Sequence, residues 1–281
     1  MILVKTIRDL QLQLTPHRQK GHRIGFVPTM GALHRGHLSL IEESRAISDI
    51  TVCSIFVNPT QFNNKQDFEK YPVTITRDID MLEGAGCDIL FLPAVAEMYP
   101  ANETLPHYDL GYLETVLEGE FRPGHFQGVC QIVDKLLQAV QPTTLFLGQK
   151  DYQQCMVIAR MIELRQHPVQ LQICTTVREQ DGLAMSSRNM RLSDSERQQA
   201  LYIIKTLRRI KQELRPGDMD SLKKEAAAYL EQNGFKVDYV AIADAGSLEL
   251  VNDWDGKTAV VALVAAFLNE VRLIDNLVLH P

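Results

Sequence analysis

Short apolar runs that alternate with helix-like stretches constrain the first part of this chain more than any other feature. The runs at 24–27 and 50–57 read as buried strands, and the second is rich in β-branched residues. Strands that alternate with helices predict a parallel sheet covered on both faces, here the open, doubly wound form of an α/β fold. Further strands are expected at 89–92, 145–147 and 169–173, with helices over 38–48 and 131–139.

The last third of the chain changes character near residue 176. Two amphipathic patterns, 194–214 and 218–233, predict helices, and Asp194 is the expected N-cap of the first. We therefore expect two domains: a Rossmann-like domain over 1–176 and a smaller α+β domain over 177–281, in keeping with a length of 281 residues. The strands of the second domain are expected at 238–242, 259–267 and 273–277.

Charge, cysteine usage and hydropathy exclude several classes of protein. Lys and Arg number 29 against 35 Asp and Glu, and a net charge of −6 disfavours a nucleic-acid binder. The five cysteines form no Cys-x-x-Cys pair, which indicates buried free thiols in a reducing compartment. The N-terminus lacks a signal-peptide pattern, and the longest apolar run, 259–268, is about half a membrane span. We expect a soluble, cytoplasmic protein.

The first candidate site is the run Pro-Thr-Met-Gly-Ala-Leu-His-Arg-Gly-His at 28–37, which follows an expected strand and opens an expected helix. Ligands of parallel sheets bind at the carboxyl ends of strands, and a helix N-terminus offers free backbone N–H groups to a phosphate. His34 and His37 are three apart, so their imidazoles would share a helix face and donate to a triphosphate. The alternative is two surface histidines on an ordinary first turn. No third ligand has the spacing of a zinc site.

Three further runs carry polar side chains suited to a ligand. Residues 148–154, Gly-Gln-Lys-Asp-Tyr-Gln-Gln, follow the strand at 145–147, and residues 57–62, Val-Asn-Pro-Thr-Gln-Phe, follow the strand at 50–57. Residues 182–189 supply two Ser hydroxyls and an Arg for phosphate oxygens. The alternatives are, in turn, a helix cap at Asp151, an Asn-Pro turn and a polar loop between domains. All but the Ser-Ser-Arg run fall at one edge of one sheet, which favours a shared site.

Taken together, these runs, with Arg-Pro-Gly-His-Phe at 122–126 and Val-Arg-Leu-Ile-Asp-Asn at 271–276, resemble the pantothenate synthetase family. The resemblance covers essentially the whole chain, with the motifs in family order. The family belongs to the His-x-Gly-His nucleotidyl transferases, and the resemblance implies a Rossmann-like domain with a C-terminal lid. It also implies a homodimer, ATP with Mg²⁺ as its complex, and pantoate and β-alanine as substrates, with an adenylate intermediate.

The resemblance implies roles for individual residues, matched motif by motif. His37 is the expected catalytic histidine, and His34, Lys150, Ser186, Ser187 and Arg188 are expected to act at the phosphates. Gln61 is expected to bind pantoate and β-alanine, and Gln154 to bind pantoate. Residues 63–77 match a flap of the family, which carries Val73 where relatives have Arg. The expected ATP site comprises Met30, Gly31, Ala32, Leu33, His34, Arg35, Gly36, His37, Gly148, Gln149, Lys150, Asp151, Tyr152, Val177, Met185, Ser186, Ser187 and Arg188.

Two other functions share part of this pattern. An adenylyltransferase that leaves a dinucleotide product shares the His-x-Gly-His motif. Such an enzyme would not be expected to carry the sequence runs around Gln61 and Gln154. A nucleotide-sensing module would bind ATP without releasing AMP. An aminoacyl-tRNA synthetase is disfavoured by the chain's length, its acidity and its lack of a basic RNA-binding segment.

Overall fold

The computed structural model describes residues 1–63, 65–101 and 103–280, with the backbone alone for Lys65 and Gln66. Its contacts group into two compact units. The first comprises Met1–Gln149 and Val157–Thr175, and the second comprises Lys150–Met156 and the chain from Thr176 onward. The short segment at 150–156, which carries Lys150, therefore belongs to the second unit although it lies within the first in sequence.

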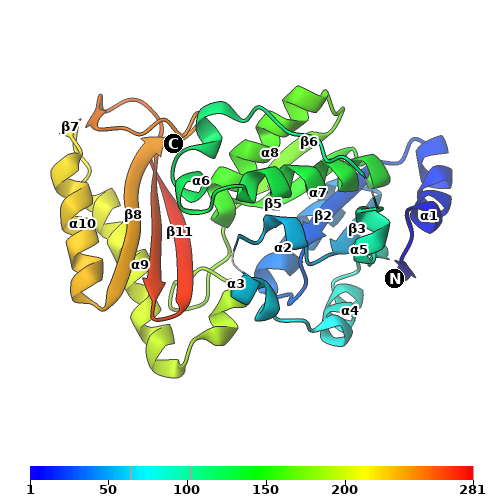
Figure 1. Cartoon of the computed structure of the whole chain (residues 1–281), viewed down its shortest axis with the longest axis horizontal. Coiled ribbons are helices and arrows are strands. Elements are labelled where there is room, and N and C mark those ends of the chain that lie inside the picture. Colours follow the sequence, from blue (N-terminus) through cyan, green and yellow to red (C-terminus); the bar gives the residue numbers. More distant parts are fainter. Residues whose placement is uncertain (64, 102, 281) are drawn as a thin grey trace. The chain divides into compact units, whose positions relative to one another are not determined.

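The described residues of the first unit form a six-stranded parallel sheet in the order β1-β4-β3-β2-β5-β6 (Figure 1). The inner strands are apolar runs buried on both faces, as parallel sheets require. This confirms the doubly wound α/β fold expected from the sequence. The strands are β1 (Ile2–Val4), β2 (Ile24–Thr29), β3 (Ile50–Ile55), β4 (Ile89–Phe91), β5 (Thr144–Gly148) and β6 (Gln170–Cys174).

Helices cover this sheet. Helix α2 packs across β2, β3 and β5, while α1 and α7 pack against each other and α7 reaches β2. Right-handed crossovers place α2 and α4 on one face, and α1 and α7 on the other, because the chain crosses the sheet in opposite directions. The helices are α1 (Ile7–Gln19), α2 (Arg35–Ile47), α3 (Lys65–Glu69), α4 (Ile75–Gly84), α5 (Val95–Met98), α6 (Glu118–Phe121), α7 (His125–Val140) and α8 (Tyr152–Arg165), with 3₁₀ turns η1 (Pro59–Gln61), η2 (Gly111–Glu114) and η3 (Gln149–Asp151).

The strand order reverses between β2 and β5, and this reversal locates the candidate site. From β2 the chain proceeds through β3 to β4 on one side, whereas β5 and β6 lie on the other. In open α/β sheets, ligands bind beyond the carboxyl ends of the strands at such a switch point. The segment after β2 carries His34 in its loop and His37 in the first turn of α2, and β5 ends at Gly148, where the next turn begins.

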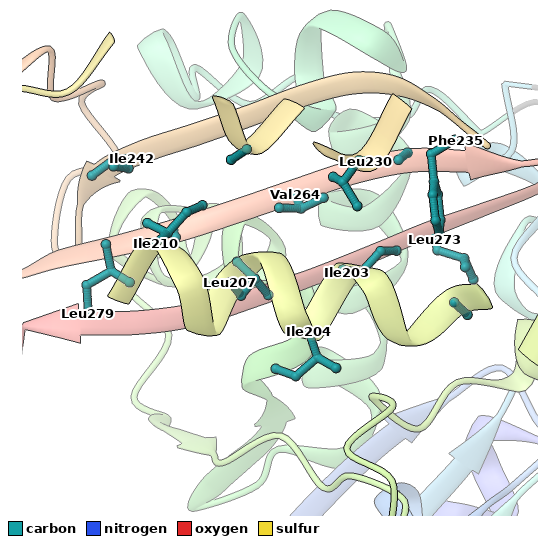
Figure 2. Packing of buried hydrophobic residues seen from close by; sticks show 14 of the residues in the cluster. Ile203, Ile204, Leu207, Ile210, Leu230, Phe235, Ile242, Val264, Leu273 and Leu279 are labelled. Carbon is teal, nitrogen blue, oxygen red and sulfur yellow. The ribbon is translucent and has the colours of Figure 1, made fainter. Parts of the chain in front are cut away.

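The second unit contains a three-stranded antiparallel sheet, β11-β10-β8, and a two-stranded ribbon of β7 and β9. Two helices, α9 and α10, cover one face of the larger sheet (Figure 1). Figure 2 shows Ile203, Leu207 and Ile210 of α9 directed at strand residues such as Val264 and Leu273, which together form a buried core. The elements are α9 (Asp194–Glu213), α10 (Asp220–Gln232), β7 (Gly217–Asp218), β8 (Phe235–Asp244), β9 (Asp253–Trp254), β10 (Val260–Leu268) and β11 (Val271–His280), with η4 (Ser187–Arg191) before them.

The N-cap of α9 differs from the expected one. Asp194 is the first residue of the helix, and Ser193 caps it by accepting the Glu196 backbone N–H. Glu196 in turn accepts the Ser193 backbone N–H at 2.8 Å, which completes a capping box. The prediction of Asp194 as the cap was therefore wrong by one residue, because two good capping residues are adjacent.

Candidate active site

The backbone after β2 makes a tight left-handed turn at Gly31 and Ala32, with φ of +82° and +49°. Glycine tolerates this region, but an alanine there is strained and needs a compensating contact. Asp78 of α4 supplies it. One carboxylate oxygen accepts the Ala32 N–H at 2.9 Å and the other accepts the Leu33 N–H at 2.8 Å.

Asp78 is fully buried, so these hydrogen bonds replace its hydration. Thr74 Oγ1 adds a third hydrogen bond at 3.0 Å to the same carboxylate. The Asp78 carboxylate therefore holds the backbone of the loop after β2 in its left-handed conformation. This role in the loop was not predicted from the sequence, although a signal was present: Asp78 falls within the apolar stripe of Ile75, Ile79 and Leu82 on one helix face.

The two histidines cap helix α2 through an unusual pair of hydrogen bonds. His34 is the N-cap, and its Nδ1 accepts the Gly36 backbone N–H at 3.2 Å. His37 Nδ1 accepts the His34 backbone N–H at 3.3 Å, and the two ring centroids lie 4.0 Å apart. Because Nδ1 of each ring accepts a hydrogen bond from a backbone N–H, each neutral ring carries its own proton on Nε2. Both imidazoles are thus preorganised as Nε2–H donors.

This capping corrects one expectation about the loop. Its backbone N–H groups were expected to be free for a phosphate. Instead the N–H of Gly31 donates to Thr29 Oγ1 at 3.2 Å, and four further N–H groups donate to the Asp78, His34 and His37 side chains. These five N–H groups are therefore already engaged within the protein. The four N–H groups are those of Ala32, Leu33, His34 and Gly36.

Gln61 lies beside the histidine loop within the first unit. Its Nε2 is 2.8 Å from Sδ of Met30, and its Oε1 accepts a hydrogen bond from Asn58 Nδ2 at 3.1 Å. Asn58 is the buried N-cap of η1, the turn on which Gln61 sits. The structure thus brings together Met30, expected at the ATP site from the family resemblance, and Gln61, expected to bind pantoate and β-alanine.

Arg35 behaves differently from its neighbours in the expected ATP set. Its guanidinium forms an exposed ion pair with Glu42 of the same helix at 2.5 Å, and this hydrogen bond raises the pKa of Arg35. The Arg35 side chain therefore pairs with a residue on the exposed surface of its own helix. Within the flap expected at 63–77, Asn64 lies outside the described residues, and Val73 is 69% exposed.

The turn after β5 carries the run Gly-Gln-Lys-Asp-Tyr-Gln-Gln at 148–154. Gly148 ends β5 and Gln149 begins η3 in the first unit, whereas Lys150 belongs to the second. There the Lys150 carbonyl accepts a hydrogen bond from Asn276 of β11 at 2.9 Å. The remaining members of the motif that were expected at the site, Asp151, Tyr152 and Gln154, are partly buried.

Tyr152 is anchored in the second unit. Burial raises the pKa of Tyr152, so the side chain stays a neutral phenol. Its hydroxyl donates to the Ala245 carbonyl at 2.7 Å. This hydrogen bond fixes the first turn of α8, which also carries Gln154.

The Ser-Ser-Arg run follows a short hairpin rather than an irregular loop. Met185 N–H donates to the Val177 carbonyl at 3.1 Å, which brings together two residues of the expected ATP set. Ser186 then caps η4 by accepting the Arg188 N–H at 3.3 Å, and Ser187 is buried. The chain thus presents these residues on ordered secondary structure within the second unit.

A buried ion pair ties this hairpin to β11. Arg178 donates through two nitrogens to Asp275, at 2.6 and 3.0 Å, and also to the Asn276 carbonyl at 3.2 Å. Asp275 is 5% exposed. Asp275 and Asn276 therefore hold the hairpin and the Lys150 turn to the same strand. The role of Asp275 could not be predicted from the sequence, because its partner Arg178 lies 97 residues earlier in the chain.

The thiols and possible metal ligands complete the description. None of the five cysteines, all within the described ranges, forms a disulfide, and all are buried, as expected. Burial raises the pKa of Cys87 to about 12 and that of Cys174 to about 11. Over residues 1–63, 65–101 and 103–280, no group of three or more His, Cys, Asp or Glu side chains is placed to hold a metal ion. Over the same residues, no helix has the length and apolar character needed to cross a bilayer.

Comparison with known proteins agrees with the geometry. Residues 2–278 match the family model described as pantoate-beta-alanine ligase. The chain is 45% identical to a pantothenate synthetase of Bacteroides thetaiotaomicron, over 99% of this chain and 98% of that protein. It is 42% identical to that of Fervidobacterium nodosum, over the full length of both.

Solved structures give the same result. The crystal structure of pantoate-beta-alanine (pantothenate synthetase) from Thermus thermophilus superposes with a TM-score of 0.89 at 40% identity, covering all of both chains. A pantoate-beta-alanine ligase from Francisella tularensis, complexed with beta-gamma ATP and beta-alanine, has a TM-score of 0.83 at 35% identity, covering 99% and 97%. This chain therefore belongs to the pantoate–β-alanine ligase family.

Proposed function

We propose that this protein condenses pantoate with β-alanine at the expense of ATP, and that it releases pantothenate, AMP and pyrophosphate. The observation that carries the proposal is the pair of Nε2–H donors of His34 and His37, held by backbone hydrogen bonds beyond β2 at the switch point of the sheet. Membership of the ligase family supplies the substrates. The Francisella relative was solved in complex with beta-gamma ATP and beta-alanine, which agrees with this assignment.

In the first step a pantoate carboxylate oxygen attacks the α-phosphorus of ATP, and the bond to the bridging oxygen breaks to release pyrophosphate. Such transfers depend on positioning and on stabilising charge that develops on phosphate oxygens. We assign that stabilisation to His37 and His34, with Lys150, Ser186, Ser187 and Arg188 as further donors. Mg²⁺ enters as the MgATP complex, because it prefers phosphate oxygens and water as ligands.

In the second step the neutral amine of β-alanine attacks the carbonyl carbon of the pantoyl adenylate. The carbon–oxygen bond to the phosphate breaks, AMP leaves with that oxygen, and the amine loses a proton. Exclusion of water protects the mixed anhydride. We assign pantoate to Gln61 and Gln154, and β-alanine to Gln61.

The remaining assignments belong to the same proposal. The expected ATP-site residues, from Met30 to His37, from Gly148 to Tyr152, Val177 and from Met185 to Arg188, form the nucleotide site. The domain over 177–281 acts as a lid on the domain over 1–176. We further propose that the protein is a homodimer and that it works in the cytoplasm. Light scattering after gel filtration tests the dimer, and a monomer at micromolar concentration would refute it.

The test is to follow nucleotide products while each substrate is omitted in turn. AMP and pyrophosphate should accumulate with pantothenate only when ATP, Mg²⁺, pantoate and β-alanine are all present. A dinucleotide product from an adenylylated phosphate would instead support an adenylyltransferase. ATP binding by folded protein without AMP release would leave only a nucleotide-binding module.

A further inference from the structure

The Arg-Pro-Gly-His-Phe motif at 122–126 has no role in the account so far, yet its side chains reach the turn that carries Gln61. His125 is the first residue of α7 and is 6% exposed. Its Nδ1 lies 2.8 Å from the backbone carbonyl oxygen of Gln61. A buried imidazole therefore contacts the backbone of the residue assigned to both pantoate and β-alanine.

Arg122 determines which nitrogen of His125 carries the proton. The guanidinium nitrogen Nη1 of Arg122 lies 3.0 Å from His125 Nε2. A guanidinium has donors only, so Nε2 must accept, and the proton of the ring then resides on Nδ1. The ring thus donates to the Gln61 carbonyl. Glu118, 3.5 Å from the same guanidinium, holds Arg122 in place, and both side chains are largely buried.

Close backbone packing joins the same two elements. A Cβ added at Gly128 of α7 would overlap the carbonyl oxygen of Thr60, so only glycine permits the helix to approach η1 this closely. The Gly128 carbonyl accepts a hydrogen bond from Asn58 Nδ2 at 3.0 Å, and the same nitrogen donates to Gln61 Oε1. Tyr99 Oη donates to Asn58 Oδ1 at 2.7 Å, which fixes the orientation of that amide.

From these contacts we propose that Arg122 and His125 are positioning residues for the acid substrate. Arg122 fixes the His125 tautomer, and His125 fixes the Gln61 backbone, so that the Gln61 amide is held in one orientation next to Met30. The inference rests on the proposed function, because Gln61 matters here as the pantoate-binding residue. His125 does not contact the reacting atoms in this account, and its loss should alter pantoate binding more than the handling of ATP.

Steady-state kinetics of the full-length protein test this with three variants. His125→Ala removes the donor, His125→Asn restores an N–H close to the position of Nδ1, and Arg122→Met removes the group that fixes the tautomer. His107→Ala is the matched control, because His107 is an exposed histidine on the segment before α7. Melting temperatures identify variants that fold.

We expect His125→Ala to raise KM for pantoate about tenfold, the usual effect of one lost hydrogen bond, with KM for ATP within about twofold of wild type. Arg122→Met should show the same pattern, His125→Asn should recover most of the loss, and His107→Ala should match wild type. In a Gln61→Ala background, His125→Ala should add little.

A pantoate KM within twofold of wild type in folded His125→Ala and Arg122→Met would overturn the inference. An equal rise in both KM values, or no recovery in a folded His125→Asn, would also overturn it. If His125→Ala does not fold, the pantoate and ATP KM values of Arg122→Met and His125→Asn test the inference in its place. Wild-type protein that makes no pantothenate would refute the proposed function itself, which separates the two failures.

Discussion

His34 and His37 lie with their ring centroids 4.0 Å apart, and each ring accepts a backbone N–H through Nδ1. The helix cap and the orientation of both Nε2–H groups are therefore one structural feature. A substitution that removes the ring also removes the cap. Experiments on these histidines must separate the two effects.

Two variants of His37 make that separation. His37→Ala removes the cap acceptor and the Nε2–H donor, whereas the side-chain oxygen of His37→Asn can still accept the His34 N–H. Both should lower kcat by about 10² or more, the scale for one lost transition-state donor. Only His37→Ala should also lose about 1 kcal/mol of stability, the typical value of one capping hydrogen bond at a helix N-terminus. Turnover and urea unfolding measure the two quantities, and near-normal turnover in either folded variant would contradict the assigned role.

Asp78→Asn should distort the turn that leads to the histidines. An amide offers one acceptor where the carboxylate offers two, so the Ala32 or Leu33 N–H loses its partner. An unsatisfied buried N–H costs about 1–3 kcal/mol, and we expect that loss of stability together with lower kcat/KM for ATP. Asp80→Asn, two residues along α4 and exposed, is the control. Equal behaviour of the two variants in urea unfolding and kinetics would refute this role.

The Arg178–Asp275 pair should stabilise the hairpin that carries Val177 and Met185. Asp275→Asn leaves a largely buried guanidinium without its carboxylate, and breaking such pairs costs about 3 kcal/mol. Chemical denaturation measures the loss, with exposed Asp253→Asn as the control. The double variant Arg178→Met/Asp275→Asn should lose less than the sum of the two single losses. Additive losses would show that the two side chains are not coupled.

Acid stability should depend on Asp134. Burial alone would raise the pKa of this carboxyl, but hydrogen bonds from neighbours such as His167, at 2.6 Å, and Tyr108, at 2.7 Å, hold it below 3.8. Since the folded-state pKa is depressed, the ionised carboxylate stabilises the fold above about pH 4, and that contribution is lost as the pH falls through the lower folded-state pKa. Melting temperature against pH should therefore fall less steeply between pH 4 and 2 for Asp134→Asn than for wild type. Exposed Asp109→Asn should keep the wild-type slope.

The sequence predicted the main elements well because their signals are local. The five expected strands of the first unit appear as β2 to β6, and those of the second as β8, β10 and β11, each within a few residues. The helix expected over 131–139 begins earlier, at His125. Its first turn was missed because it contains His, Gln and Gly, which give a weak helical signal in the sequence. Strand β1 was missed, since three residues at a sheet edge carry no periodicity.

The internal geometry of the candidate site was harder to predict, because it depends on contacts between distant segments. The carboxylate of Asp78 reaches a loop 46 residues earlier in the chain, and Asp275 reaches Arg178 over 97 residues. Pattern analysis recognised the His-x-x-His run but not that His34 lies outside the helix as its cap. The Arg122–His125 contact to Gln61 is likewise visible only in three dimensions.

Transfer of oxygen from pantoate to AMP tests the central claim, activation as an adenylate, most directly. Pantoate labelled with ¹⁸O in its carboxylate is incubated with the protein, MgATP and β-alanine, and AMP is analysed by mass spectrometry. Because the attacking carboxylate oxygen stays on phosphorus when the amine displaces AMP, the account predicts one ¹⁸O in each AMP released. Unlabelled AMP, with pantothenate still formed, would contradict it.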